Sequence, residues 1–384
     1  MALGFKGEQS ILERYERDRA SLRLKTMVAL GVLLVLVLFS LCTGTSRFGL
    51  LYSPLEVVGC YGTWLQLNVV ALIDPSVLLH KTELLEQYPM YYEVIARLAY
   101  TFITVVCGML LAVAGMLYQN VFRNPIAAPS MLGVTSGISF GCMMMVWVFG
   151  QAAASATFYD LRFAFCFVGG VVVLLIVLAL GGLVSGKRTL NMLDVMLVAT
   201  ILTGILNAVI NYVVNSVFSD TEWTAYFEVS NVTDLTFTPL SLGVLVVVSL
   251  LCCIPVFWTR FQMNAVAFSD QEMRLLGVSP VKLRLIALAC GSLMIVVAQT
   301  YVGTAAMISL VVPFVSRGIF GAEFRRQAIG NVLIGAIVLL ACRILISFIP
   351  FVGDGVPLGT MVSLVTLPAF AWVMVVAQRQ WNNN

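Results

Sequence analysis

The chain has 384 residues, of which 60% are hydrophobic and 11% are charged, and its formal net charge is +3. Soluble domains carry about 25% charged residues, and a soluble fold of this length has too little interior to bury so much apolar surface. Composition therefore excludes a soluble protein and predicts an all-α integral membrane protein.

Apolar stretches long enough to cross a bilayer recur along the whole chain. A membrane-spanning helix needs roughly 20 apolar residues, and about ten windows meet this condition. These windows centre on residues 27–43, 96–118, 131–150, 163–185, 192–214, 237–258, 284–302, 304–321, 328–349 and 359–377. We therefore expect about ten transmembrane helices in a single membrane domain over 27–377, with tails at 1–26 and 378–384.

Basic residues predict how these helices are oriented. If the N-terminus is cytoplasmic, most basic residues fall inside: Lys6, Arg14, Arg17, Arg19, Arg23, Lys25, Arg123, Lys187, Arg188, Arg260, Arg274, Lys282, Arg284, Arg317, Arg325, Arg326 and Arg379. The outer side keeps Arg47, Lys81, Arg97 and Arg162. This excess follows the positive-inside rule and places both termini in the cytoplasm. Equal numbers of windows lie on either side of the midpoint, so the two halves have opposite orientation, as in many transporters.

The long outer loop over 44–95 contains an ambiguous stretch, residues 57–73, that is nearly long enough to cross. A crossing there would move every later basic loop to the outside, against the charge rule. We expect an interfacial helix with Tyr61 and Trp64 at headgroup depth. Membrane insertion of 57–73 remains the alternative.

Signals of catalysis, metal binding and nucleotide binding are weak. The nine cysteines lie almost entirely in apolar runs, there is no C-x-x-C motif, and His80 is the single histidine. GGLVSGKR at 181–188 resembles a P-loop but has Arg188 where Ser or Thr is required, and it follows a membrane window. We therefore expect no enzyme activity, no cofactor, no metal site and no nucleic-acid partner.

Charged residues inside the windows are rare, the clearest being Asp194 and Arg343. Carriers driven by protons or sodium usually bury carboxylates along their path. A stand-alone secondary transporter of a bulky apolar solute is therefore the less favoured alternative. For Arg343, interfacial snorkelling and a role in a transport pathway both remain open.

Residues 121–137, VFRNPIAAPSMLGVTSG, interrupt two apolar windows at the cytoplasmic side. Pro125 and Pro129 disfavour helix in the residues before them, so a turn is expected there. Asn124 can bond freed backbone groups. Gly133, Gly137 and Gly141 recur every four residues and predict close packing of the next helix against a neighbour.

The cytoplasmic segment 259–283 predicts a short amphipathic helix. Ser269 or Asp270 can cap it, Gly277 ends it, and Pro280 begins the next element. Both charge signs beside an apolar side are typical of a docking surface for a soluble partner, and an ordinary interfacial helix is the alternative.

Several of these residues form ordered motifs. G-x-x-L-A-x-x-G-x-x-x-Q (108–119) and R-N-P-I-A-A-P-x-x-L-G-V-x-x-G (123–137) resemble FecCD-type permease subunits of binding-protein-dependent ABC importers for ferric siderophores, haem and cobalamin. R-L-L-G-V (274–278), I-S-L-V-V-P (308–313) with Arg317, and V-P-L-G-T (356–360) agree, so the resemblance covers roughly residues 93 to 377.

The resemblance implies a second permease subunit, identical or not, two cytoplasmic ATPase subunits and an extracytoplasmic solute-binding protein. It also implies residue roles. The gate and pathway residues are Arg123, Asn124, Pro125, Ile126, Pro129 and Gly133; the ATPase-coupling residues are Asp270, Glu272, Arg274, Leu276 and Gly277; the binding-protein docking residue is Arg97.

The sequence also departs from the family pattern. Ala99 and Tyr100 replace the usual Pro-Arg after Arg97 and Leu98, which leaves Arg97 alone for docking, and the outer side is rich in acidic residues. A binding protein with basic patches is therefore one hypothesis. Free metal ions would need carboxylate or histidine ligands, so we rank a ferric siderophore first, haem second and cobalamin third.

Overall fold

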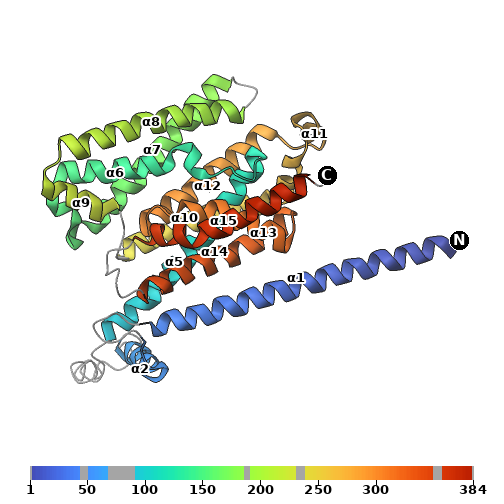
Figure 1. The fold of residues 1–384 in the computed structure, drawn as a ribbon, viewed down its shortest axis with the longest axis horizontal. Coiled ribbons are helices and arrows are strands. Elements are labelled where there is room, and N and C mark those ends of the chain that lie inside the picture. The colour runs from blue at the N-terminus through green and yellow to red at the C-terminus, as the bar shows by residue number, and fades with distance from the viewer. Residues whose placement is uncertain are drawn as a thin grey trace.

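The computed structural model describes residues 2–43, 51–67, 91–185, 191–230, 238–348 and 357–382, and these residues are almost entirely helical (Figure 1). The predicted all-α class is confirmed. Within these ranges the extended structure is confined to one isolated bridge between Thr43 and Leu51.

The helices follow one another along the chain with short connections. They are α1 (Ala2–Cys42), α2 (Pro54–Leu65), α5 (Tyr91–Phe122), α6 (Val134–Phe149), α7 (Tyr159–Ser185), α8 (Met192–Ser216), α9 (Asp220–Ser230), α10 (Pro239–Trp258), α11 (Asp270–Leu275), α12 (Pro280–Val302), α13 (Ala306–Phe320), α14 (Phe324–Ser347) and α15 (Leu358–Asn382). Short 3-10 turns include η3 (Pro129–Leu132), η4 (Gly150–Ala154) and η6 (Gln262–Ala267).

Eight helices of the described chain are long and apolar enough to cross a membrane, and α13 and the first part of α15 are apolar but shorter. Each predicted window overlaps one of these helices. The number of crossings and their orientation stay predictions. Figure 1 shows α11 at the same end of the bundle as both termini, as the predicted orientation requires.

The core of the bundle is built around α5 and α12. In their membrane-spanning windows, 72% and 67% of the residues are buried, against 11% in α1 and 17% in α8. Helix α5 meets α14 at a glycine pair, where a Cβ atom on Gly108 would lie 2.4 Å from the carbonyl oxygen of Gly335. Glycine at this crossing lets the two backbones touch.

Close packing of α6 was predicted from three glycines, and two of them confirm it. A Cβ on Gly137 would lie 2.7 Å from Gly169 O of α7, and one on Gly141 would lie 2.2 Å from Phe165 O. The prediction was wrong for Gly133, which precedes α6 with φ of 70° and faces Thr203 of α8. A left-handed residue cannot belong to a right-handed helical face, so Gly133 ends the turn instead.

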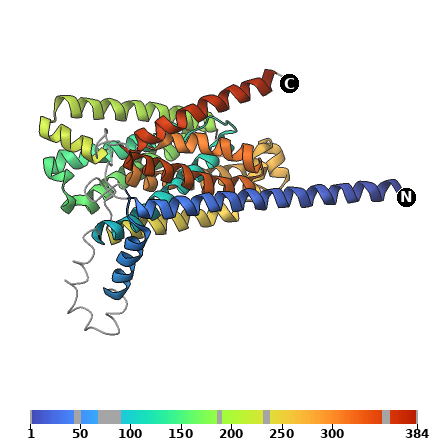
Figure 2. The same cartoon turned by 60° about the horizontal axis from the view of Figure 1, so that its bottom comes forward.

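The N-terminal elements lie at the edge of the bundle. Helix α1 is continuous through the predicted tail, and its N-terminal part extends beyond the other helices in both views (Figures 1 and 2). Lys25 Nζ donates to Ile319 O at 2.7 Å, which fixes α1 to the end of α13. Helix α2 has 12 residues, too few to cross a bilayer. Residues 68–73 lie outside the described residues, so the placement of 57–73 as a whole stays a prediction.

Candidate functional site

The turn after α5 has a backbone conformation that is unusual for its sequence. Arg123 has φ of 50°, the one positive φ at a non-glycine residue in the described chain. Its N–H donates to Asn120 O and the Asn124 N–H donates to Gln119 O, both at 3.1 Å. This is the Schellman pattern, in which glycine is the usual left-handed residue. The turn predicted over 123–129 is confirmed, and we name residues 123–129 the gate turn.

Side-chain bonding shapes the rest of the gate turn. The Ile126 N–H donates to Asn124 Oδ1 at 3.0 Å, so Asn124 bonds a freed backbone group as expected. The side chains from Arg123 to Ile126 are exposed, whereas Pro129 is buried in η3. The four residues implied to close an inner mouth therefore face open space.

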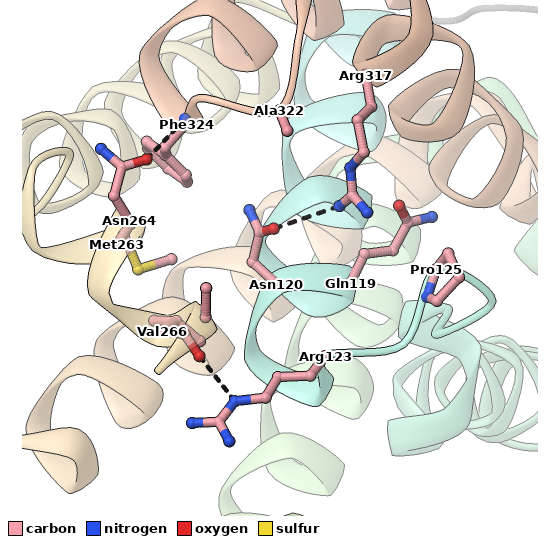
Figure 3. Close-up of a pocket in the computed structure, with 11 residues that line it drawn as sticks. Gln119, Asn120, Arg123, Pro125, Met263, Asn264, Val266, Arg317, Ala322 and Phe324 are labelled. Carbon is pink, nitrogen blue, oxygen red and sulfur yellow. Dashed lines mark hydrogen bonds between the residues drawn. The ribbon is translucent and has the colours of Figure 1, made fainter. Parts of the chain in front are cut away.

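The side chain of Arg123 crosses to a distant segment. Its Nε donates to Val266 O at 2.7 Å (Figure 3), and its Nη2 donates to Phe268 O. Its Nη2 also lies 3.5 Å from Asp270 Oδ1. All three partners belong to η6 and the start of α11, so the gate turn is bound directly to the predicted coupling segment. This contact was not predicted from the sequence.

Helix α11 begins and ends where the sequence predicts. Ser269 caps it, because the Glu272 N–H donates to Ser269 Oγ at 3.3 Å and the Ser269 N–H donates to Glu272 Oε2 at 2.8 Å. Hydrogen bonds from the Ser269 backbone and hydroxyl hold the pKa of the Glu272 carboxyl below its ordinary value. Gly277, with φ of 75°, closes a second Schellman turn, and α12 starts at Pro280.

The coupling residues differ in exposure. Met273 is fully buried, whereas Leu275 is 88% and Leu276 60% exposed. Arg274 and Gly277 are also exposed. The short helix is therefore anchored by one apolar residue and presents an apolar tip to a missing neighbour, which is typical of a partner-binding element.

Arg284, in the first turns of α12, is a functional candidate that the sequence analysis missed. Its guanidinium donates to both carboxylate oxygens of Asp270, at 3.0 and 2.5 Å, and its side chain is only 10% exposed. Asp270 is thus shared by Arg284 and Arg123. The available signal was an arginine placed at the apolar start of a window, which the sequence analysis counted only as a cytoplasmic positive charge.

Two cavities lie beside this cluster. The first, of about 280 Å³, lies between the gate turn, η6 and the adjoining ends of α13 and α14 (Figure 3). It is lined by Gln119, Asn120, Arg123, Pro125, Met263, Asn264, Val266, Ala267, Arg317, Ala322 and Phe324. The second, of about 310 Å³, is lined by Arg123, Asp270 and Arg284 together with Asn191 and Met192 at the start of α8.

Helix α8 has a polar face that the sequence analysis also missed. Thr200, Gly204, Asn207, Asn211 and Asn215 follow helical spacing and are all exposed in the single chain. Polar amides facing lipid are costly, and in membrane helices they usually face water or other protein. The missed signal was three asparagines spaced four residues apart within an apolar run.

The predicted docking residue lies elsewhere than on an open surface. Arg97, near the outer end of α5, is only 9% exposed. Burial of this kind gives no support to docking through Arg97, and that role stays a prediction. His80 and the P-loop-like residues 186–188 lie outside the described residues. In the described ranges, no group of three or more His, Cys, Asp and Glu side chains is arranged to hold a metal ion.

Solved structures share this fold. A structure described as an inward-facing conformation of a metal-chelate-type ABC transporter superposes with a TM-score of 0.69 and 18% identity, covering 92% of this chain and 99% of the other. At that identity the likeness shows the fold alone.

Sequence relatives are closer. The probable iron chelatin transport system permease protein of Helicobacter pylori (strain ATCC 700392 / 26695) is 28% identical over 77% of this chain and 85% of its own length. The Fe(3+) dicitrate transport system permease protein FecC of Escherichia coli (strain K12) is 27% identical over 72% and 81%. The hemin transport system permease protein HmuU of Yersinia pestis is 28% identical over 74% and 83%.

The family model of the FecCD transport family matches residues 64–376. That match covers most of the chain, including the gate turn, α8 and α11, and the apolar helices described above are those of a multi-pass protein of the bacterial inner membrane. The chain therefore belongs to the FecCD transport family.

Proposed function

We propose that this chain is the permease subunit of a binding-protein-dependent ABC importer that moves an iron chelate into the cytoplasm. The observation that carries the proposal is the polar face of α8, which gives a mostly apolar bundle one path for a polar solute. Relatives named for iron chelatin, Fe(3+) dicitrate and hemin transport support the choice of cargo.

The pathway requires a second permease subunit. In the single chain the face with Asn207, Asn211 and Asn215 is open, and only 17% of the α8 window is buried. A second subunit that faces α8 would enclose these amides in a water-filled path and remove the cost of exposing them to lipid. The partner is an identical or a related subunit.

Two cytoplasmic ATPase subunits supply the energy. The exposed tip of α11, with Leu275 and Leu276, provides the apolar contact, and Ser269 keeps the helix rigid at its start. Because Asp270 and the carbonyl groups before it hold Arg123, a shift of α11 pulls on the gate turn. ATP binding would thereby bias a two-state gate.

The cargo passes as a whole chelate. Neutral amides on α8 can hydrogen-bond the organic shell of a chelate, but they are poor ligands for bare Fe³⁺, which needs charged oxygen or imidazole donors. A ferric siderophore is the first candidate, haem the second and cobalamin the third. An extracytoplasmic solute-binding protein delivers it, with Arg97 as the proposed contact once the surrounding outer segment moves.

Reconstitution in proteoliposomes with the cognate ATPase and solute-binding protein tests this function. We expect uptake of one iron chelate that requires ATP and stimulates ATP hydrolysis. Uptake that persists without the ATPase subunits would favour the secondary transporter instead. If ferric chelates, haem and cobalamin all leave hydrolysis unchanged, the proposed cargo class is wrong.

A further inference from the structure

The cavity at the inner mouth combines positive charge with an absence of acidic lining residues. Arg123 and Arg317 line it, and none of its lining residues is Asp or Glu. Arg123 is already bonded to Val266 O, Phe268 O and Asp270, so its charge is largely compensated. Arg317 is the group whose charge remains to be explained.

Arg317 lies in the last turn of α13 and is half-buried. Its Nη2 donates to Asn120 Oδ1 at 3.4 Å, a long hydrogen bond, and no carboxylate of the described chain lies within 4.0 Å of its guanidinium. A guanidinium has five N–H donors and forms its strongest pairs with carboxylates and phosphates, in bidentate geometry. Most of these donors are unused here.

The amide groups around the cavity also favour an acceptor ligand. Asn264 Oδ1 accepts from the Phe324 N–H at 2.9 Å, and Asn120 Oδ1 accepts from Arg317 (Figure 3). Both amide oxygens are therefore occupied, which leaves the NH₂ groups as donors. Figure 3 shows Arg317 and Asn120 on one wall and Asn264 on the opposite wall.

We propose that this cavity is an oxyanion subsite in which Arg317, flanked by Asn120 and Asn264, binds a carboxylate or similar group of the departing cargo. The inference rests on the proposed function and narrows it: the cargo is a chelate that carries negative charge on its outer oxygens. The cavity of about 280 Å³ has room for such a group and several waters, each of which takes about 30 Å³. Its position beside Pro125 and Arg123 places the subsite at the gate turn.

Binding from the cytoplasmic side tests the subsite without involving the solute-binding protein. The permease–ATPase complex in nanodiscs is titrated with two probes, anionic ferric dicitrate and a neutral ferric tris-hydroxamate. We expect ferric dicitrate to bind more tightly. Arg317→Gln should weaken its binding roughly tenfold to a hundredfold, because charge-assisted hydrogen bonds are lost, and should leave the neutral chelate unaffected.

Two further variants make the test specific. Arg326→Gln removes a nearby arginine that does not line the cavity and is paired with Glu323 at 2.9 Å, so ferric dicitrate binding should not change. Asn120→Asp is isosteric and gives Arg317 a carboxylate partner inside the protein. It should weaken ferric dicitrate binding as Arg317→Gln does, and it keeps the proposal testable if Arg317→Gln fails to fold.

The results separate this inference from the proposed function. Equal affinity for ferric dicitrate in wild type, Arg317→Gln and Asn120→Asp would overturn the subsite, as would tighter binding of the neutral chelate. Either result leaves ATP-dependent uptake of a chelate by the wild-type importer intact. If no chelate supports such uptake, the proposed function itself fails.

Discussion

Asp270, the first residue of α11, forms a two-point ion pair with Arg284 of α12 at 3.0 and 2.5 Å, and the same carboxylate lies 3.5 Å from Arg123 of the gate turn. One side chain therefore joins the proposed ATPase contact, the gate turn and a core helix. Because Arg284 is nearly buried while Asp270 is 45% exposed, the carboxylate is the movable member of the group.

Asp270→Asn should uncouple ATP hydrolysis from transport. The amide keeps the shape of the side chain but removes the charge that holds Arg123 and Arg284, at a cost of about 1–3 kcal/mol for the buried guanidinium. We expect uptake per ATP hydrolysed to fall severalfold while hydrolysis continues. Arg326→Gln, which alters an exposed pair within α14, is the matched control. An unchanged uptake-to-hydrolysis ratio in Asp270→Asn would show that the shared carboxylate plays no part in coupling.

Asn124→Ala should loosen the gate turn. The variant loses the hydrogen bond from the Ile126 N–H, which contributes about 1 kcal/mol. We expect increased passive leak of a small solute from proteoliposomes, with normal assembly. Asn124→Asp retains the acceptor oxygen and should restore the seal. If both variants leak no more than wild type, residues 123–129 act as a plain turn.

Asn211→Cys tests the pathway along α8. In a background without other reactive cysteines, a membrane-impermeant maleimide should label it in the assembled importer, because water reaches this face. Leu250→Cys on α10, a position that is 57% exposed in the single chain, is the control and should stay unlabelled in lipid. Labelling at position 250 but not at 211 would place the pathway on another face.

Gly115→Ala should destabilise the bundle. A Cβ at position 115 would lie 1.7 Å from Ser309 O, and Pro313, four residues later, provides no N–H to bond that carbonyl oxygen. The helices must move apart, at a cost of about 1–3 kcal/mol or more. Thermal unfolding in detergent should show a lower Tm. Gly243→Ala is the matched control, since nothing lies within 4 Å of its Cβ position. Equal Tm values for the two variants would contradict the close α5–α13 contact.

Acid should weaken the start of α11. The pKa of Glu272 is lowered from its ordinary 4.5 by hydrogen bonds from Ser269, so the folded state favours the ionised form. The resulting stabilisation is complete above pH 4.5 and is lost as the pH falls through the lower folded-state value. Amide hydrogen exchange over 270–276, corrected for the intrinsic rate, should quicken in that acidic range in wild type. In Glu272→Gln this additional acid effect should disappear; its persistence would assign the effect to another group.

Much of the site could be predicted because its signals are local. Prolines at 125 and 129 and the Ser269–Glu272 capping pair act on neighbouring backbone, so the turn and the short helix follow from residues a few positions apart. The roles given to Asn124 and Arg274 came from family resemblance, and they stay predictions. Arg97 could be assigned to docking from the motif alone, but its burial depends on packing that the motif does not encode.

The sequence by itself determined that the chain lies in lipid, where its apolar stretches fall, and how the gate turn and α11 begin and end. Each of these depends on hydrophobicity or on backbone chemistry within one segment. Only the tertiary structure decided that Arg123, Asp270 and Arg284 share one cluster, that Arg317 has no carboxylate partner in the described chain, and that the asparagines of α8 share an exposed face. Contacts between residues more than a hundred positions apart, such as Arg123 with Val266, arise when helices pack. That packing is set by steric fit at sites such as Gly108 and Gly115, which neither composition nor periodicity specifies.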